Sequence, residues 1–250
     1  MKEKCGADHT YRSVKLRAKA LLLERGNLLR LILGSFIVFL MFETVFFTYQ
    51  AVCSLFTAEP HSFVLLIGFV LALLTASPFA LSFHRMVYRM SKGDETSIGD
   101  MFYFCRAKGL TDVVFISALC MSELMVKLVL SMSLGVITVG VLSGFGSEIF
   151  SPASLIFAAA FMIPISSAFN RATNLPILFF EGENFADAMR LSKNGAKAQP
   201  RETVLFKASF VLPFLVSLLT LGIWLIVWLM PLYILSGVLL SSKFVSDIKQ

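Results

Sequence analysis

The stretch LLRLILGSFIVFLMFETVFFTYQAVCSLF, residues 28–56, decides the fold of this chain. After Arg30 it carries one charged residue, Glu43. A helix needs about 20 mostly apolar residues to cross the hydrocarbon core of a bilayer. The stretch is therefore predicted to be a membrane-spanning helix.

The composition of the 250 residues agrees with a membrane protein. Hydrophobic residues make up 57% of the chain and charged residues 15%, and the mean hydropathy is +0.79. Soluble domains average about 25% charged residues. The net charge of +6 would suit nucleic acid, but the charges lie in short segments between apolar runs, without a dense basic tract. We therefore expect a lipid bilayer as the surroundings and no nucleic-acid partner.

The other apolar runs predict five more spans. The second, third and fourth cover 63–86, 112–142 and 153–169, the last with an apolar extension to 180. The final block, 204–241, is too long for one crossing, and its natural break is Leu219-Thr220-Leu221-Gly222. The predicted fold class is all-α, a polytopic membrane protein with six transmembrane helices arranged as three hairpins.

The basic residues give this layout an orientation. Of the 22 Lys and Arg residues, 21 lie up to Arg30, in 85–108, in 171–207 and in the tail. The three opposite loops hold none, and Lys127 lies inside the third span. Basic loops stay on the cytosolic side of a membrane. We predict that both termini are cytosolic, with a segment 1–27, a single transmembrane domain 28–241 and a tail 242–250.

The cytosolic segments are predicted to form amphipathic surface helices, one before each hairpin. The first would run from Tyr11 to Gly26. Such helices lie in the membrane interface with apolar residues toward lipid and basic residues toward anionic headgroups. The residues expected to face lipid are Val14, Ala18, Leu21 and Leu22, and those expected to face headgroups are Arg12, Lys15 and Lys19.

The second and fourth spans end in the same pattern, P-x4-F-x-R. The matching residues are Pro78, Phe83 and Arg85 in the second span and Pro164, Phe169 and Arg171 in the fourth. A Gly-acidic step and an amphipathic piece containing Asp follow each copy, with Gly93-Asp94 and Asp100 after the first and Gly182-Glu183 and Asp187 after the second. The pattern indicates either a duplicated hairpin or chance similarity between two apolar helices.

Three ionisable residues are predicted at membrane depth: Glu43, Glu123 and Lys127. Such residues are functional-site hypotheses by default. Glu123 and Lys127 are four residues apart and share one helix face, and Glu43 can reach Lys127 if the first and third spans are neighbours. The cluster is either a transport or proton-relay site or an ion cluster that locks helices together. A pair compensated within one helix favours the lock.

Nothing in the sequence carries a signature of catalysis or metal binding. The four cysteines are scattered, the three histidines are isolated, and no nucleophile elbow, phosphate-binding loop or zinc-protease motif occurs. We expect no metal, no cofactor and no enzymatic activity. The acidic steps at Asp94-Glu95 and Glu181-x-Glu183 either touch a cation or face solvent.

Four stretches of the C-terminal half resemble a known family. They are Ala188-Met189-Arg190-Leu191-Ser192-Lys193, Phe206-Lys207-Ala208-Ser209-Phe210, Leu219-Thr220-Leu221-Gly222-Ile223-Trp224 and Pro231-Leu232-Tyr233. The chain resembles a family of bacterial six-helix membrane proteins that is classified as a domain of unknown function. The family is distantly similar to the membrane domain of glycerophosphodiester phosphodiesterases. The resemblance implies a bacterial cytoplasmic membrane and carries over no functional residues.

Three classes of function remain open from the sequence. The first is a non-enzymatic membrane module that packs with or regulates envelope proteins or forms a homo-oligomer. The second is a small transporter or permease that uses the charged cluster. The third is an intramembrane enzyme, for which no nucleophile and base are visible. A transporter is expected to open its cluster to a polar cavity, whereas a packing module is expected to seal it.

Overall fold

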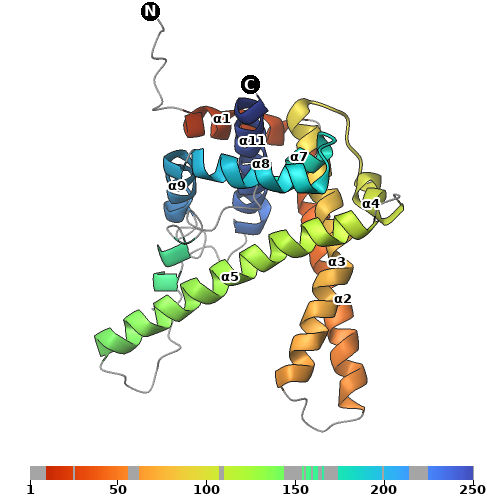
Figure 1. Ribbon diagram of the computed structural model, residues 1–250, viewed down its shortest axis with the longest axis vertical. Helices are drawn as coiled ribbons and strands as arrows, with labels where there is room; N and C mark the ends of the chain where they lie inside the picture. Colours follow the sequence, from red (N-terminus) through yellow and green to blue (C-terminus); the bar gives the residue numbers. More distant parts are fainter. Residues whose placement is uncertain are drawn as a thin grey trace, which may run out of the picture.

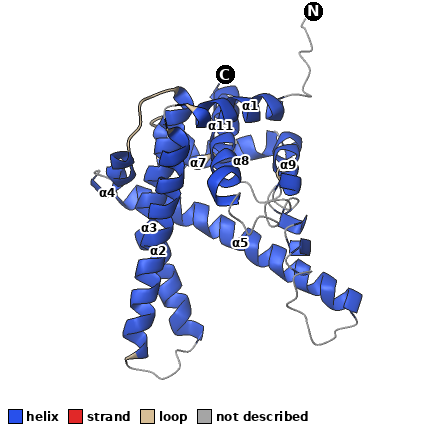
Figure 2. Ribbon diagram, turned by 180° about the vertical axis from the view of Figure 1, so that it is seen from behind, coloured by secondary structure: helices blue, strands red, loops and turns tan. Residues whose placement is uncertain are grey.

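The computed structural model describes residues 10–24, 26–55, 62–106, 110–143, 154, 156–158, 160–162, 165, 174–198, 200–213 and 225–249. Within these ranges the fold is all-helical, as predicted, and contains no strand (Figure 2). The elements are α1 (Thr10–Leu23), α2 (Asn27–Ser54), α3 (Ser62–Lys92), η2 (Ile98–Phe102), α4 (Tyr103–Arg106), α5 (Leu110–Ser143), α7 (Leu175–Phe180), α8 (Phe185–Ala198), α9 (Pro200–Ala208), η3 (Leu225–Leu229) and α11 (Met230–Lys249).

Four helices among the described residues are long and apolar enough to cross a membrane. They are Asn27–Ser54, Ile67–Lys92, Thr111–Leu142 and Val227–Asp247. They correspond to the first, second, third and sixth predicted spans. Most of the predicted fourth span and residues 214–224 of the last apolar block lie outside the described residues.

Helices α2 and α3 lie side by side (Figure 1). Small residues allow the close approach. A Cβ added at Gly34 would lie 2.7 Å from the Phe83 ring, and one at Gly68 would clash with the Tyr49 ring. Ala72, on α3, is fully buried. Small residues at a helix contact let the backbones approach, which is how helices pack where lipid surrounds them.

Helix α5 crosses α3 and then runs away from the α2–α3 pair (Figure 1). At the crossing, the Ser117 hydroxyl donates to the backbone carbonyl of Ser77 at 3.0 Å. Farther along, a Cβ at Gly135 would lie 2.5 Å from the carbonyl oxygen of Ser154. The described residues that begin the predicted fourth span therefore pack against α5.

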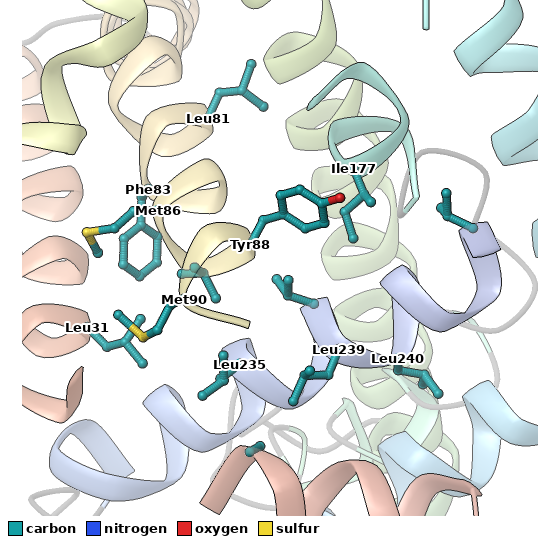
Figure 3. Packing of buried hydrophobic residues seen from close by; sticks show 14 of the residues in the cluster. Leu31, Leu81, Phe83, Met86, Tyr88, Met90, Ile177, Leu235, Leu239 and Leu240 are labelled. Carbon is teal, nitrogen blue, oxygen red and sulfur yellow. The ribbon is translucent and has the colours of Figure 1, made fainter. Parts of the chain in front are cut away.

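Several helices form a compact layer at the end of the molecule opposite the tips of α2 and α3 (Figure 1). We call this layer the basic end. It contains α1, α7, α8, α9, the last turns of α3 and much of α11. Its core is built of fully buried aliphatic and thioether side chains (Figure 3), among them Leu31, Met86, Met90, Leu235 and Val245. Burying one such side chain contributes about 1.5–3 kcal/mol.

Helix α1 packs on α11, which corrects the expectation that its apolar face meets lipid. Val14, Ala18 and Leu22 are buried, with Ala18 fully so, and Leu21 packs partly buried against the same core. The helical period predicted the apolar face correctly. It did not reveal the partner, because α11 lies more than 200 residues away along the chain.

One of the basic residues assigned to lipid headgroups instead fastens α1 to the protein. Lys15 Nζ donates to the hydroxyl of Ser209 at 3.0 Å and to its backbone carbonyl at 3.2 Å. The same ammonium lies 4.1 Å from the centre of the Phe210 ring. Burial lowers the pKa of Lys15. Arg12 and Lys19 remain exposed, as predicted.

The predicted tail from residue 242 is also part of the folded layer. Helix α11 continues to Lys249, and Phe244 and Val245 are 6% and 0% exposed. The apolar face of the helix therefore extends past the predicted boundary at residue 241. Charged residues such as Lys243 hide this continuation in the sequence, because they occupy the other face.

Candidate functional site

The predicted pair on α5 forms. Lys127 Nζ donates to Glu123 Oε1 at 2.5 Å, and the two side chains are 10% and 13% exposed. The spacing of four residues places both groups on one helix face. Each charge compensates the other, so the burial cost of either is reduced.

Glu43 does not join this pair. It is half-buried on α2, whose main partner is α3, and no hydrogen bond or ion pair of Glu43 occurs among the described residues. The expected meeting with Lys127 assumed that the first and third spans stand side by side. Helix α5 instead crosses α3 and then leaves the α2–α3 pair, so equal depth along the helices does not bring the residues together (Figure 1).

A further lysine, Lys207 on α9, lies near the pair. The charges of Lys127 and Glu123 both act electrostatically on its ammonium group. Burial, and then the like charge of Lys127, lower the pKa of Lys207 to about 8. In the sequence, this lysine served as a topology signal and in the family resemblance, and it was not predicted as a site residue. The signal that could have found it is its position after Val204, Leu205 and Phe206, inside an apolar run.

A cavity of about 210 Å³ lies beside Lys207, between α3, α7, α9 and α11. Its polar lining consists of His84, Asn174, Thr203, Lys207, Tyr233 and Ser241. The remaining described wall is apolar and includes Phe206, Val238 and Phe244. Neither Glu123 nor Lys127 is among the described lining residues, so the predicted charged pair and the cavity are adjacent but separate.

Asn174 is the most unusual residue of the cavity wall. It lies at the start of α7, where an asparagine side chain ordinarily caps the helix, yet it makes no capping hydrogen bond. The residue is 1% exposed, and its Oδ1 has no hydrogen-bond partner among the described residues. A buried polar atom without a partner costs about 1–3 kcal/mol.

In the first copy of the repeated pattern, all three residues have structural roles in or around α3. Pro78 has no amide hydrogen for the carbonyl of Leu74, and the hydroxyl of Ser77 donates to that carbonyl instead, at 2.8 Å. Phe83 is buried against Gly34. The guanidinium of Arg85 lies 3.6 Å from the centre of the Tyr103 ring. These three roles are structural.

The second copy, Pro164, Phe169 and Arg171, lies outside the described residues. The turns that follow the two copies are both described, and they match. After α3, Gly93 N donates to Met90 O and Asp94 N donates to Arg89 O, each at 3.1 Å. After α7, Gly182 N donates to Phe179 O at 3.1 Å and Glu183 N donates to Leu178 O at 3.2 Å.

The helices after these turns also begin alike. Asp100 Oδ2 accepts the backbone N–H of Ser97 at 2.8 Å. Asp187 Oδ2 accepts from the side-chain amide of Asn184, and Asn184 Oδ1 accepts the backbone N–H of Asp187, at 2.8 and 2.9 Å. The Gly-acidic step with a following Asp therefore codes one local structure twice, a helix stop and then a helix start.

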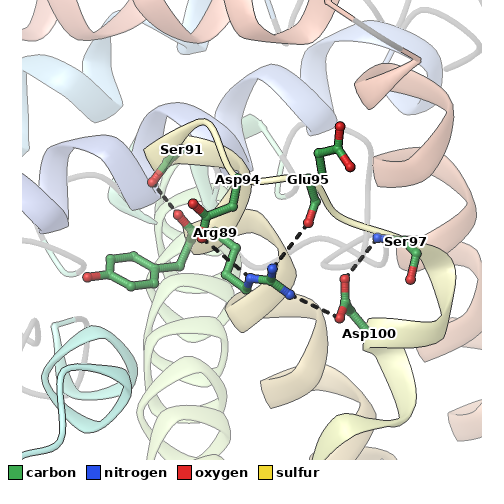
Figure 4. A network of polar contacts seen from close by, with 7 residues as sticks. Arg89, Ser91, Asp94, Glu95, Ser97 and Asp100 are labelled. Carbon is green, nitrogen blue, oxygen red and sulfur yellow. Dashed lines mark hydrogen bonds and ion pairs between the residues drawn. The ribbon is translucent and has the colours of Figure 1, made fainter.

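The acidic steps are occupied by cationic and hydroxyl groups of the protein. Arg89 reaches Asp94 at 3.5 Å, Asp100 at 3.2 Å and the carbonyl of Glu95 at 3.2 Å (Figure 4). Glu181 accepts from Tyr88 at 2.8 Å. Among the described residues, no group of three or more His, Cys, Asp or Glu side chains is placed to hold a metal ion.

Neither a protein-family model, nor a curated protein, nor a solved structure gives a significant match to this chain. The resemblance to bacterial six-helix membrane proteins therefore stays a prediction. The candidate site rests on the geometry of its own residues, the sealed Glu123–Lys127 pair and the cavity beside Lys207.

Proposed function

We propose that this chain is a multi-pass protein of a bacterial cytoplasmic membrane with six spans and both termini cytosolic. We propose that it works without catalysing a reaction, as a membrane module that packs with or regulates other envelope proteins. Four membrane-capable helices support the membrane assignment. The gathering of α1, α8 and the last turns of α3 and α11 at one end supports the orientation, because these segments carry most of the described basic residues (Figure 1).

The main support for a role other than transport is that Glu123 and Lys127 are bonded to each other and largely buried. A proton relay or a substrate pathway needs ionisable groups that face a water-filled route. The Glu123 and Lys127 side chains are 13% and 10% exposed and bonded to each other, and neither is among the described residues of the cavity wall. This arrangement supports an ion pair that fixes α5 in place.

A small transporter is the alternative function. The cavity supports this transporter function, because Lys207 lines the cavity and also interacts electrostatically with Glu123 and Lys127. In that reading, a change of structure at Lys207 would open the pair to the cavity. The two functions therefore differ in whether the pair is needed for flux or only for folding.

The experiment compares folding and flux for variants of the pair in proteoliposomes. Lys127→Met leaves a buried carboxylate without its partner, and we expect a loss of about 3–5 kcal/mol in the free energy of unfolding. The double variant E123L/K127M replaces the pair with apolar groups, and we expect stability near that of the wild type. Glu43→Gln is the matched control, and we expect no change in stability from it.

Proton and solute flux are measured on the same vesicles with internal pH-sensitive and self-quenching dyes. The proposal expects flux at the level of empty vesicles for the wild type and for E123L/K127M alike. Flux above that level in the wild type, lost in a double variant of normal stability, would instead establish transport.

A further inference from the structure

The cavity beside Lys207 has the features of a binding site that the packing role does not use. It has a volume of about 210 Å³ and is lined by residues of α3, α7, α9 and α11. In this measure one water needs about 10–15 Å³, so the space can hold a group much larger than a water molecule. Exposed side chains that line it include His84 and Tyr233.

The described wall of the cavity contains a lysine, Lys207. Glu123 and Lys127 are bonded to each other, and the charges of both act on Lys207. No acidic residue occurs among the described residues of the wall. Apolar side chains such as Phe206, Val238 and Phe244 lower the local dielectric constant, which strengthens the attraction of Lys207 for an anion.

The hydrogen-bonding groups of the wall suit an oxyanion. Thr203 and Ser241 bring hydroxyl groups, and Lys207 brings an ammonium group. Asn174 brings an amide that holds both donors and an acceptor, and its buried Oδ1 has no partner among the residues that the structure describes. A phosphate monoanion carries acceptor oxygens and an O–H donor, and so it matches both kinds of group on Asn174.

We propose that this cavity binds a phosphate group, held by Lys207 and Asn174. The group can come from free phosphate or from the headgroup of an anionic lipid. The cavity lies beside His84, eight residues before the end of α3, which is about 12 Å along the helix. That depth below the basic end is within reach of a lipid headgroup as well as of a soluble anion.

The experiment uses the full chain in nanodiscs of phosphatidylcholine and two probes. Inorganic phosphate tests the free anion, and dihexanoyl phosphatidic acid tests a lipid phosphate with short chains. Binding is measured by calorimetry and by the rise in melting temperature. Binding of inorganic phosphate assigns the site to the free anion, and binding of the lipid probe alone assigns it to a headgroup. If neither probe binds at millimolar concentration, the proposal is wrong.

Three variants locate the binding. Lys207→Met removes the charge, and we expect affinity to fall at least tenfold. Asn174→Leu removes a buried group that makes no capping bond, so we expect equal or higher stability together with weaker binding. Gly237→Val places a side chain where a Cβ has no neighbour within 4 Å, and it fills part of the cavity without changing any charge.

The matched control is Lys193→Met, which removes an exposed lysine of the same end. We expect it to bind like the wild type. Binding that survives both Asn174→Leu and Gly237→Val in folded protein, or that Lys193→Met weakens as much as Lys207→Met does, would place the phosphate elsewhere on the basic surface and overturn the assignment to this cavity.

Discussion

The hydroxyl of Tyr88 donates a hydrogen bond to Oε1 of Glu181 at 2.8 Å and so joins the ends of α3 and α7 across 93 residues of chain. The Lys92 ammonium lies 3.9 Å from the same oxygen and 4.5 Å from the centre of the Tyr88 ring. The two similar glycine turns are therefore fastened to each other, and the link closes the basic end beside the cavity-lining helix α7.

Removing this link is expected to loosen the basic end. Tyr88→Phe keeps the buried ring and deletes the donor, and we expect a loss of about 0.5–1.5 kcal/mol in the free energy of unfolding. Tyr103→Phe is the control, because the described structure gives the Tyr103 ring a cationic neighbour, Arg85, and its hydroxyl no bond. Denaturant unfolding in mixed micelles measures both. An equal effect of the two variants would remove the role assigned to the hydroxyl.

The two glycine turns are expected to resist substitution equally. Gly93 and Gly182 have φ of 86° and 88°, in the left-handed region, and a Cβ at either would meet nothing within 4 Å. Backbone strain is thus the sole cost, about 1–2 kcal/mol for alanine at each position. Gly237→Ala, inside α11, is the control and is expected to be neutral or stabilising. Thermal unfolding of the three single variants tests this, and a tolerated Gly93→Ala would contradict it.

Detaching α1 is expected to make its backbone accessible to protease. Ala18→Asp puts a carboxylate at a fully buried position against the core shared with α11, and an unpaired buried charge is strongly unfavourable. We expect trypsin to cut after Arg17 or Lys19 at least ten times faster than in the wild type. Ala20→Asp lies on the exposed side of the same helix, and we expect trypsin to cut this variant at the wild-type rate. Equal rates for both variants would show that α1 is not held by its apolar face.

Phosphate binding at the cavity is expected to weaken as pH rises through about 8. The pKa of Lys207 is lowered to about 8, so the lysine is charged below that pH and loses its attraction for an anion above it. The phosphate gains negative charge over the same range and loses the O–H that would donate to Asn174 Oδ1, so the contribution of Lys207 is isolated by a variant whose charge does not titrate. Calorimetry at pH 7 and pH 9 is expected to show a fall of several-fold.

Among the described residues, the titratable groups near Lys207 include Lys127 and Glu123 from α5, His84 from α3 and Tyr233 from α11. The range from pH 7 to 9 lies between the ordinary pKa values of imidazole and phenol, about 6.5 and 10. Lys207→Arg is the control, because a guanidinium stays charged throughout. If the arginine variant loses affinity with pH as the wild type does, another group controls binding.

Apolar length and helical period predicted the parts of the fold that depend on local sequence. They placed α2, α3, α5 and the last span, and the spacing of four residues predicted the bond between Glu123 and Lys127. Gly93 and Gly182 were recognised as similar steps for the same reason, since a helix stop is coded within a few residues. The predictions that involved distant partners were less successful.

The expected contact of Glu43 depended on which helices are neighbours, and the crossing of α5 over α3 decided against it. The apolar face of α1 was found, but its partner α11 was not, because an amphipathic helix has the same pattern whether lipid or protein covers it. Lys207 and Asn174 were missed as site residues for a related reason. A lysine and an asparagine carry no spacing rule, and only the fold brings them to one cavity.

The docking of α1 on α11 has a consequence for how the protein is made. A ribosome produces α1 before α11, so the apolar face of α1 has no permanent cover until α11 has been synthesised. During that interval it needs a temporary host, such as the bilayer surface or a chaperone. The basic end therefore closes only after α11 has been synthesised, so its assembly is a late event compared with the pairing of α2 and α3.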